Sequence, residues 1–508
     1  MQSYKKNYIQ IYFWQSIAFL LNFAALFIVT PLISDNKDIF GIYSVCVGLN
    51  VFLQYADFGF LNAGKKYTAE AYISGNILKE KKILGTSFSI FSAVCIIIAL
   101  ALFLLSFYPN YIISGIDSDG CNFKVASKLL FISAVSVPIY VLQKYTGFIY
   151  SVRLRDFEIQ RAIIVGSFVR IVSVPLVFFN EHYDIVGYYT FSQVVVFVIT
   201  LFVLFKSRKL GYGLQSVIFI VKFDKQSFLE IKPLALSGFV ASLSWLLYYE
   251  MDSFVISITM GAQAVAIYAI GRSIQSVIRS LFGILYSPYA VRFNYYVGSF
   301  DINGLFAFFQ RLVDLFSNIC VAPLIVLFIF ARPFVLAWVG PAYEDSVLVL
   351  QLLICCYIVN YFTSPAGSLL YSLNRVRDVL YISILEPMVF YIGLFITMNY
   401  LGVVSVAIFK LVSILSSTIF YVFVVSKIVY NRIDIVKLLN LKRIVIPAIV
   451  TFIFSYMISS NILIEEKSKE SLFIIVSVMA VVTMIIYGVI CFFDKNVKNE
   501  IISLIKKN

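Results

Sequence analysis

The stretch LGTSFSIFSAVCIIIALALFLLSF occupies residues 84–107 and contains no charged side chain. An α-helix rises about 1.5 Å per residue, so roughly 20 apolar residues cross the ~30 Å hydrocarbon core of a bilayer. Apolar runs of similar length recur near residues 12–33, 39–58, 129–150, 161–180, 184–205, 234–259, 265–290, 314–337, 346–371, 379–399, 401–425, 443–461 and 471–493. The sequence therefore predicts an all-α integral membrane protein with about 14 transmembrane helices.

The composition indicates that lipid is the main solvent. Of the 508 residues, 61% are hydrophobic and 13% are charged, whereas a typical soluble domain has about 25% charged residues. The net charge of +13 lies in short loops between apolar runs, so it does not form the solvated basic patch that binds nucleic acid. Seven cysteines without a C-x-x-C pair and the single histidine His182 predict no disulfide framework, no metal centre and no cofactor.

The basic residues are unequally divided between the loops on the two sides. Of the 40 Lys and Arg residues, 29 fall on the side that carries Lys5 and the Lys206–Lys232 segment, and six fall on the other side. Cytoplasmic loops of multi-pass proteins carry the excess of Lys and Arg. We therefore expect both termini in the cytoplasm and Cys121 outside. All outward loops are short, which leaves no room for an extramembrane catalytic domain.

A weak internal repeat predicts two halves of equal orientation. Residues 40–45, FGIYSV, recur as VAIYAI at residues 265–270, an offset of 225 residues. Parallel repeats of this kind occur in several secondary transporters. We expect an N-terminal lobe of helices 1–6 at residues 1–210, a C-terminal lobe of helices 7–12 at 211–430, and a helix pair with a tail at 431–508.

Five basic residues fall within the apolar runs, and such residues are functional hypotheses by default. They are Lys144, Arg170, Arg272, Arg279 and Lys410. Arginine forks match phosphate oxygens, so this surplus of positive charge suggests a cavity between the halves that takes an anion. The alternative is that these side chains snorkel to water or bond to backbone carbonyls.

Fewer acids lie in the apolar runs. Glu250 and Asp252 come late in the seventh run, and Asp57 ends the second. Folding the seventh and eighth helices into a hairpin puts Asp252 at the depth of Arg272, where the two can pair. We expect these acids to take part in coupling or gating, and the alternative is an ion pair that serves only folding.

The most specific local motif follows the second run. Residues 57–71, DFGFLNAGKKYTAEA, resemble the D-L-G-x-x-x-A…R-Y-x-A-E pattern of polysaccharide flippases of the multidrug/oligosaccharidyl-lipid/polysaccharide exporter superfamily. Residues 41–43 fit the start of the same helix in that family, and residues 261–268 and 288–292 resemble the matching part of the second half. The chain looks most like the O-antigen (Wzx-type) branch, although the basic residue of the motif is doubled as Lys65 and Lys66.

This resemblance implies a V-shaped, MATE-like bundle of two six-helix lobes with two added C-terminal helices. It also implies a function in lipopolysaccharide and O-antigen biosynthesis. The substrate would be an undecaprenyl-pyrophosphate-linked oligosaccharide, flipped from the cytoplasmic to the periplasmic leaflet of a bacterial inner membrane. The partners would be this lipid-linked substrate, the bilayer and other polysaccharide assembly proteins.

Two other functions stay open on the sequence. A multidrug exporter of the same superfamily would share the fold, but it should favour acids in its cavity, and here the bases outnumber them. A membrane enzyme of polysaccharide assembly, such as an O-antigen polymerase or ligase, would resemble proteins with one large periplasmic loop. We expect a transporter rather than an enzyme, without direct use of ATP because no Walker motif is present.

Overall fold

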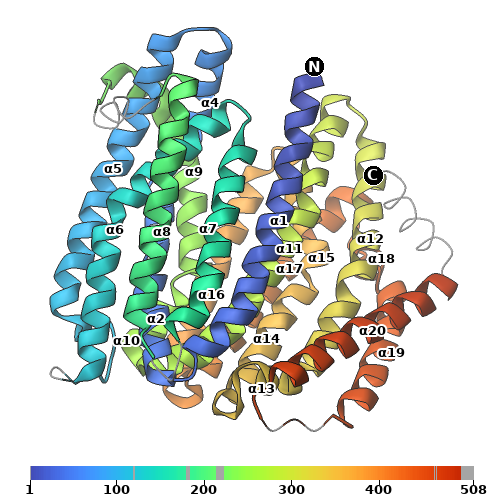
Figure 1. Ribbon diagram of the computed structural model, residues 1–508. Helices are drawn as coiled ribbons and strands as arrows, with labels where there is room; N and C mark the ends of the chain where they lie inside the picture. The colour runs from blue at the N-terminus through green and yellow to red at the C-terminus, as the bar shows by residue number, and fades with distance from the viewer. Residues whose placement is uncertain are drawn as a thin grey trace. The chain divides into compact units, whose positions relative to one another are not determined.

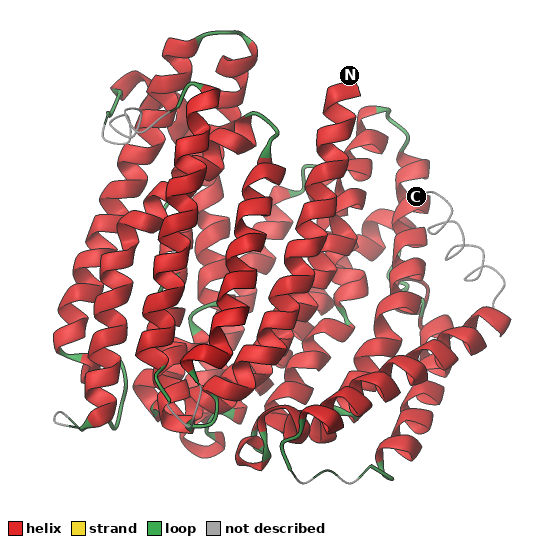
Figure 2. Ribbon diagram, in the orientation of Figure 1, coloured by secondary structure: helices red, strands yellow, loops and turns green. Residues whose placement is uncertain are grey.

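The computed structural model describes residues 2–117, 120–178, 183–212, 222–462, 464 and 466–493. Within these ranges every regular element is a helix (Figure 2). His182, residues 213–221 of the expected cytoplasmic segment and the expected tail from residue 494 lie outside them. The predicted all-α class is confirmed.

Contacts divide the chain into two units, residues 1–266 and 267–508 (Figure 1). Unit 1 contains α1 (Gln2–Ile33), α2 (Lys37–Gly48), α3 (Val51–Tyr55), α4 (Phe60–Ile73), α5 (Ile77–Phe107), η1 (Pro109–Tyr111), α6 (Cys121–Val152), α7 (Asp156–Val177), α8 (Ile185–Lys206), η3 (Ser207–Leu210), α9 (Lys225–Tyr249) and α10 (Asp252–Met260). Helix α11 (Ala262–Gly298) begins in unit 1 and lies mostly in unit 2. Unit 2 continues with α12 (Ile302–Ile329), α13 (Ala331–Val339), η5 (Pro341–Tyr343), α14 (Ser346–Ile358), α15 (Asn360–Ser372), α16 (Val376–Leu401), α17 (Val404–Tyr430), α18 (Ile435–Leu438), α19 (Leu441–Ser459) and α20 (Lys469–Phe493).

The helices have the length and apolarity of membrane spans. Among the described residues, nine stretches meet both criteria: Phe13–Ile33, Lys37–Tyr55, Ile77–Phe107, Cys121–Val152, Ile185–Leu210, Ile302–Ile329, Val376–Leu401, Val404–Tyr430 and Lys469–Val489. The pair α14 and α15, bent by 44°, is a tenth candidate. Each expected apolar run overlaps a described helix or helix pair, so the structure is compatible with about 14 spans without establishing that number.

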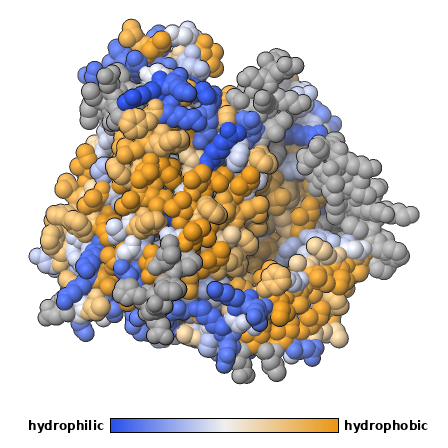
Figure 3. Space-filling model, in the orientation of Figure 1, coloured by the Kyte–Doolittle hydropathy of each residue, from blue (hydrophilic) through white to orange (hydrophobic). Residues whose placement is uncertain are grey.

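An apolar outer surface supports the membrane assignment. On α5, Ile96, Ile97, Leu100 and Leu104 are each more than half exposed. In Figure 3 apolar side chains cover much of the visible surface of unit 1, and hydrophilic side chains gather near the helix ends. Such a surface is unfavourable in water and favourable in hydrocarbon. The chain is a multi-pass membrane protein.

Four expected spans are each divided between two helices, namely α2 and α3, α9 and α10, α12 and α13, and α14 and α15. Between α2 and α3, the Asn50 N–H donates to the Val47 carbonyl at 3.1 Å, a 3₁₀ pattern that tightens the turn. The seventh expected span divides into α9 and α10, with Glu250 and Met251 between them. Hydropathy does not reveal such breaks, because the residues on both sides remain apolar.

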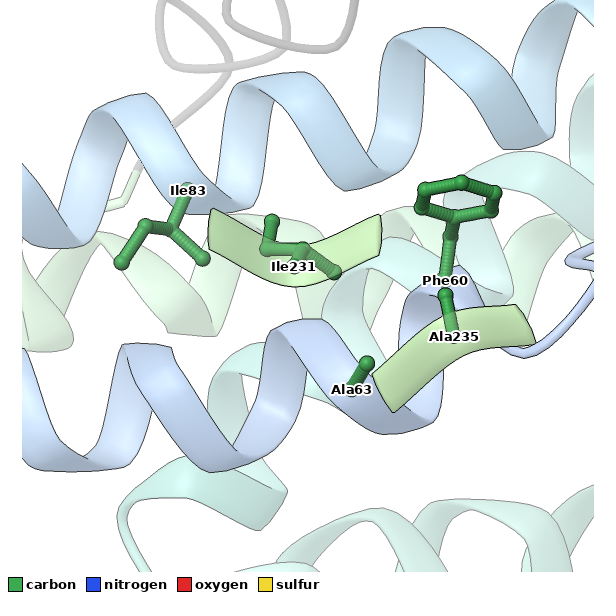
Figure 4. Packing of buried hydrophobic residues seen from close by; sticks show 5 residues of the cluster. All are labelled: Phe60, Ala63, Ile83, Ile231 and Ala235. Atoms are coloured by element: carbon green, nitrogen blue, oxygen red, sulfur yellow. The ribbon is translucent and has the colours of Figure 1, made fainter. Parts of the chain in front are cut away.

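In unit 1, α5 packs against α4 and α6, α1 against α7, and α6 against α2 and α8. Helix α9 packs on α4 and α5. Figure 4 shows the buried core of this contact, which consists of Phe60, Ala63, Ile83, Ile231 and Ala235. Each of these side chains is at most 9% exposed. The contact holds α9 against the segment that carries the flippase-like motif.

Gly59 of that motif permits the close approach. Its φ of +79° is a backbone conformation that L side chains rarely adopt. A Cβ at this position would lie 2.5 Å from the Ala235 carbonyl oxygen on α9. The glycine is therefore required twice, for the turn into α4 and for the packing of α9.

In unit 2, α16 packs against α17, and α12 packs against α14, α15 and α19. The last helix, α20, contacts α12 and α13. The two helices expected after residue 430 thus dock onto unit 2. Helices α9 and α10 group with unit 1, whereas the repeat assigns them to the lobe at 211–430. The lobe boundaries stay a prediction, because a grouping by contacts does not test an internal repeat.

Candidate functional site

The eight charged residues expected to be functional are all described, and they divide between the units. Unit 1 holds Asp57, Lys144, Arg170, Glu250 and Asp252, and unit 2 holds Arg272, Arg279 and Lys410.

Arg170, on α7, lines a cavity of about 390 Å³ inside unit 1. Residues of α3, α6 and α8 complete the walls. The Arg170 guanidinium donates to the Ser167 hydroxyl at 3.0 Å, one turn earlier on the same helix. No Asp or Glu is among the described residues that line the cavity. The structure therefore places this predicted anion-binding residue in a cavity whose described lining contains no acid.

A hydrogen-bonded triad fixes one wall of this cavity. The Asn50 amide donates to the Tyr189 hydroxyl at 2.9 Å and to the Ser133 hydroxyl at 3.5 Å. The Ser133 and Tyr189 hydroxyls are 3.0 Å apart. The three side chains come from the α2–α3 break, α6 and α8, so the break directs Asn50 toward two other helices. Buried polar networks of this kind hold helices in one arrangement.

Sequence reasoning missed the triad because it searched only for charges. A detectable signal was present, however. Asn50 and Gln54 are four residues apart, as are Tyr189 and Gln193, and Ser133, Ser136, Tyr140 and Gln143 follow helical spacing within one apolar run. Polar residues at such spacing share one helix face.

Asp57 and Lys144 lie near each other in unit 1. Asp57 is 7% exposed. At the start of α4 its carboxylate accepts hydrogen bonds from the backbone N–H groups of Gly59, Leu61 and Asn62. Lys144 is close enough to interact with this carboxylate electrostatically, and its ammonium lies 5.3 Å from the centre of the Tyr140 ring. The structure thus brings together one residue expected in the anion site and one expected in coupling.

The acids of the seventh span lie at its break. Glu250 is the C-cap residue that follows α9, and Asp252 begins α10 with a fully buried side chain. The first turn of a helix is the position where a negative charge is stabilised by the helix dipole. The pairing of Asp252 with Arg272 stays a prediction.

In unit 2, Lys410 on α17 is only 1% exposed. Its ammonium lies 5.8 Å from the centre of the Phe390 ring on α16, a distance suited to a cation–π contact. Arg272 and Arg279 are partly buried on α11, about two helical turns apart.

A buried ion pair outside the expected set joins α5 and α6 at their ends. The Arg153 guanidinium lies 2.6 Å from the Glu80 carboxylate, and the two side chains are 7% and 3% exposed. The Tyr212 hydroxyl donates to the same carboxylate at 2.8 Å. The Arg153 guanidinium also faces the rings of Tyr72 and Tyr212, at 4.6 and 4.9 Å. Arg153 is one of the 29 basic residues that the sequence assigns to the cytoplasmic side, because spacing along the chain cannot show its partners.

Comparison with known proteins shows which fold these elements form. No protein-family model and no curated protein matches the chain. Among solved structures, the lipid II flippase MurJ in an inward closed conformation has a TM-score of 0.71 and 12% identity, over 96% of this chain and 99% of that chain. A multidrug resistance MATE family transporter of the MOP superfamily, in an inward-facing conformation, has a TM-score of 0.61 and 14% identity, over 87% of this chain and 94% of that chain. A multidrug resistance MATE family transporter of the MOP superfamily in an outward-facing conformation has a TM-score of 0.52 and 14% identity, over 89% of this chain and 94% of that chain.

These structures are of a flippase and of transporters, not of enzymes. The identities are too low to carry function, but the coverage is nearly complete in both directions. This multi-pass membrane protein therefore has the fold that the MurJ flippase and the MATE transporters share.

Proposed function

We propose that this protein is a flippase for an undecaprenyl-pyrophosphate-linked oligosaccharide of the O-antigen class. It moves its substrate from the cytoplasmic to the periplasmic leaflet of the bacterial inner membrane by alternating access, with both of its own termini in the cytoplasm. The observation that carries the proposal is the fold shared with a lipid II flippase over 96% of this chain. The motif at residues 57–71 supports the polysaccharide branch.

The charges of the spans fit the chemistry of such a substrate. A pyrophosphate presents oxygens that guanidinium groups bind in bidentate fashion. Arg170, Arg272, Arg279 and Lys410 are the residues we assign to it, and Lys144 joins them when Asp57 takes up a cation. Asp252, Glu250 and Asp57 are the carboxylates available for coupling. An acid in a span favours uptake of a proton or sodium ion.

A multidrug exporter is the second candidate, and the MATE-like fold supports it. Cationic drugs call for acids and aromatic rings in the binding cavity. The described lining of the cavity around Arg170 contains no Asp or Glu, which favours the flippase.

Gene deletion separates the two. Loss of the protein in its native host should abolish surface polysaccharide and leave the lipid-linked oligosaccharide in the cytoplasmic leaflet, and a plasmid copy should restore both. Immunoblots for the polysaccharide and leaflet-specific labelling of the lipid intermediate measure this. Normal polysaccharide combined with increased sensitivity to cationic drugs would instead establish the exporter.

A further inference from the structure

We propose that the cavity of unit 1 is a carbohydrate site that holds one neutral sugar residue of the translocated oligosaccharide. This inference rests on the proposed flippase function and adds a sugar site to the pyrophosphate contacts. The site lies among α3, α6, α7 and α8.

The first argument is the chemistry of the walls. Four carboxamides line the cavity, those of Asn50, Gln54, Gln143 and Gln193. Each carboxamide offers donors and an acceptor at once, which matches a sugar hydroxyl that also donates and accepts. A metal ion or a cationic drug would call for carboxylates, and none is among the described lining residues.

The second argument is unsatisfied hydrogen-bonding capacity. The Tyr140 hydroxyl is buried and has no hydrogen-bond partner within the described part of the chain. A buried polar atom without a partner is costly, and native structures rarely keep one. The side chains of Gln54, which is exposed, and of Gln143, which is partly buried, also form no hydrogen bond with a described residue. These groups are therefore available for a ligand.

The third argument is preorganisation. The Asn50–Ser133–Tyr189 triad is complete without a ligand, so it holds the wall in place before the sugar arrives. The lining also includes aliphatic side chains, among them Ile139 and Ile163, which suit the C–H face of a sugar ring. A rigid site loses less conformational entropy on binding.

The size of the cavity agrees with this occupant. Its volume of about 390 Å³ lies at the lower end of the range of roughly 300–1,000 Å³ for small-molecule pockets. One sugar ring fits, and the lipid-linked repeat unit as a whole does not. The competing occupant is ordered water alone, because polar cavities of this size also hold water.

Saturation-transfer NMR on the purified full-length protein tests the proposal. The probes are free glucose, rhamnose, N-acetylglucosamine and N-acetylgalactosamine. At least one should receive saturation from the wild-type protein. Tyr140→Phe and Gln143→Leu should each weaken that binding about fivefold or more, the effect of losing roughly one hydrogen bond. Gln160→Leu on α7 is the matched control, because Gln160 does not line the cavity, and it should bind as the wild type does.

A second measurement does not depend on how the leucine variant folds. In a protein without its native cysteines, Ser136→Cys places a thiol in the cavity wall. The sugar that binds should slow its reaction with a small hydrophilic maleimide, whereas sorbitol should not. The sugar site would be rejected in favour of bound water if none of the four sugars received saturation from the protein. It would also be rejected if saturation transfer were the same in the wild type, Tyr140→Phe and Gln143→Leu and the sugar left the rate of thiol labelling unchanged. If the plasmid copy still restores surface polysaccharide, that failure leaves the flippase proposal standing.

Discussion

Single residues differ widely in how much their substitution destabilises this fold, and the buried Glu80–Arg153 ion pair is an example. Removing one partner of a buried ion pair leaves an uncompensated charge, which typically costs about 3–5 kcal/mol. Both side chains are nearly inaccessible, so solvent cannot take over the role of the missing partner. By contrast, Lys79 and Glu230 form a pair whose side chains are 46% and 34% exposed.

We therefore expect Glu80→Ala to lower the apparent melting temperature of the purified protein markedly. Lys79→Ala should change it little, because exposed pairs are screened by water and salt. Thermal unfolding in detergent, followed with a thiol-reactive dye on the buried cysteines, measures both. Equal melting temperatures for Glu80→Ala and the wild type would show that the buried pair does not stabilise the contact between α5 and α6.

A second residue-scale prediction concerns Gly59. Gly59→Ala should reduce stability more than Gly75→Ala, and it should reduce complementation as well. Both glycines have positive φ, +79° and +73°, so both variants carry the same backbone strain. Only at Gly59 does the new methyl group meet another helix, because nothing lies within 4 Å of a Cβ at Gly75. Membrane yield and melting temperature provide the readout, and equal losses in the two variants would contradict the packing argument.

At the scale of elements, helix ends and breaks decide where polar groups can act. The break after α2 turns Asn50 toward α6 and α8, and the break after α9 puts the buried Asp252 in the first turn of α10. Helix α6 begins at the exposed Cys121 and runs to Val152, close to Arg153. The positive-inside rule puts Arg153 in the cytoplasm and Cys121 outside.

Labelling tests this orientation of α6. In a variant that keeps only Cys121, a membrane-impermeant maleimide should react in intact cells whose outer membrane has been permeabilised. A second variant has its only cysteine as Ser74→Cys, in the turn between α4 and α5 that we expect on the cytoplasmic side. It should react only after lysis. Protection of Cys121 until lysis would reverse the topology and with it the expected location of both termini.

At the scale of the whole molecule, the proposed function assigns the pyrophosphate to interior charges that lie in both units. Arg170 and Arg279 are partly buried on α7 and α11. Retaining a guanidinium within a membrane span is costly unless it serves a partner or a substrate. In the proposed function, the guanidinium groups of both units bind the oxygens of the substrate's pyrophosphate group.

Arg170→Ala and Arg279→Ala should each abolish or sharply reduce surface polysaccharide while the protein still inserts. The Lys variants should restore it only in part, because an ammonium loses the bidentate fork. Arg377→Ala, at an exposed position near the start of α16, is the control and should behave as the wild type. Complementation at native expression, normalised to protein abundance, is the measurement. Normal polysaccharide in both alanine variants would reject the role of these arginines.

The sequence by itself determined the solvent, the helical class and the approximate positions of the long apolar helices, whereas α4 lies in none of the predicted runs. This is possible because an apolar run in lipid must satisfy its own backbone hydrogen bonds, and a helix is the way a single segment does so. The resemblance at residues 57–71 also implied the fold that the structure shares with MurJ and a MATE transporter. The apolar run at residues 265–290 was enough to put Arg272 and Arg279 on one helix.

Only the tertiary structure decided which polar side chains meet. Asn50 bonds to Tyr189 and Ser133 across 139 and 83 residues of sequence, and Glu80 pairs with Arg153 across 73. Likewise, the contact of Gly59 with α9 and the cavity beside Arg170 arise from helices that are far apart in the chain. Hydropathy predicts for each segment by itself whether it lies in lipid or in water. Contacts between side chains depend instead on which helix faces pack together. That choice follows from the fit of side chains between helices, which no single segment contains.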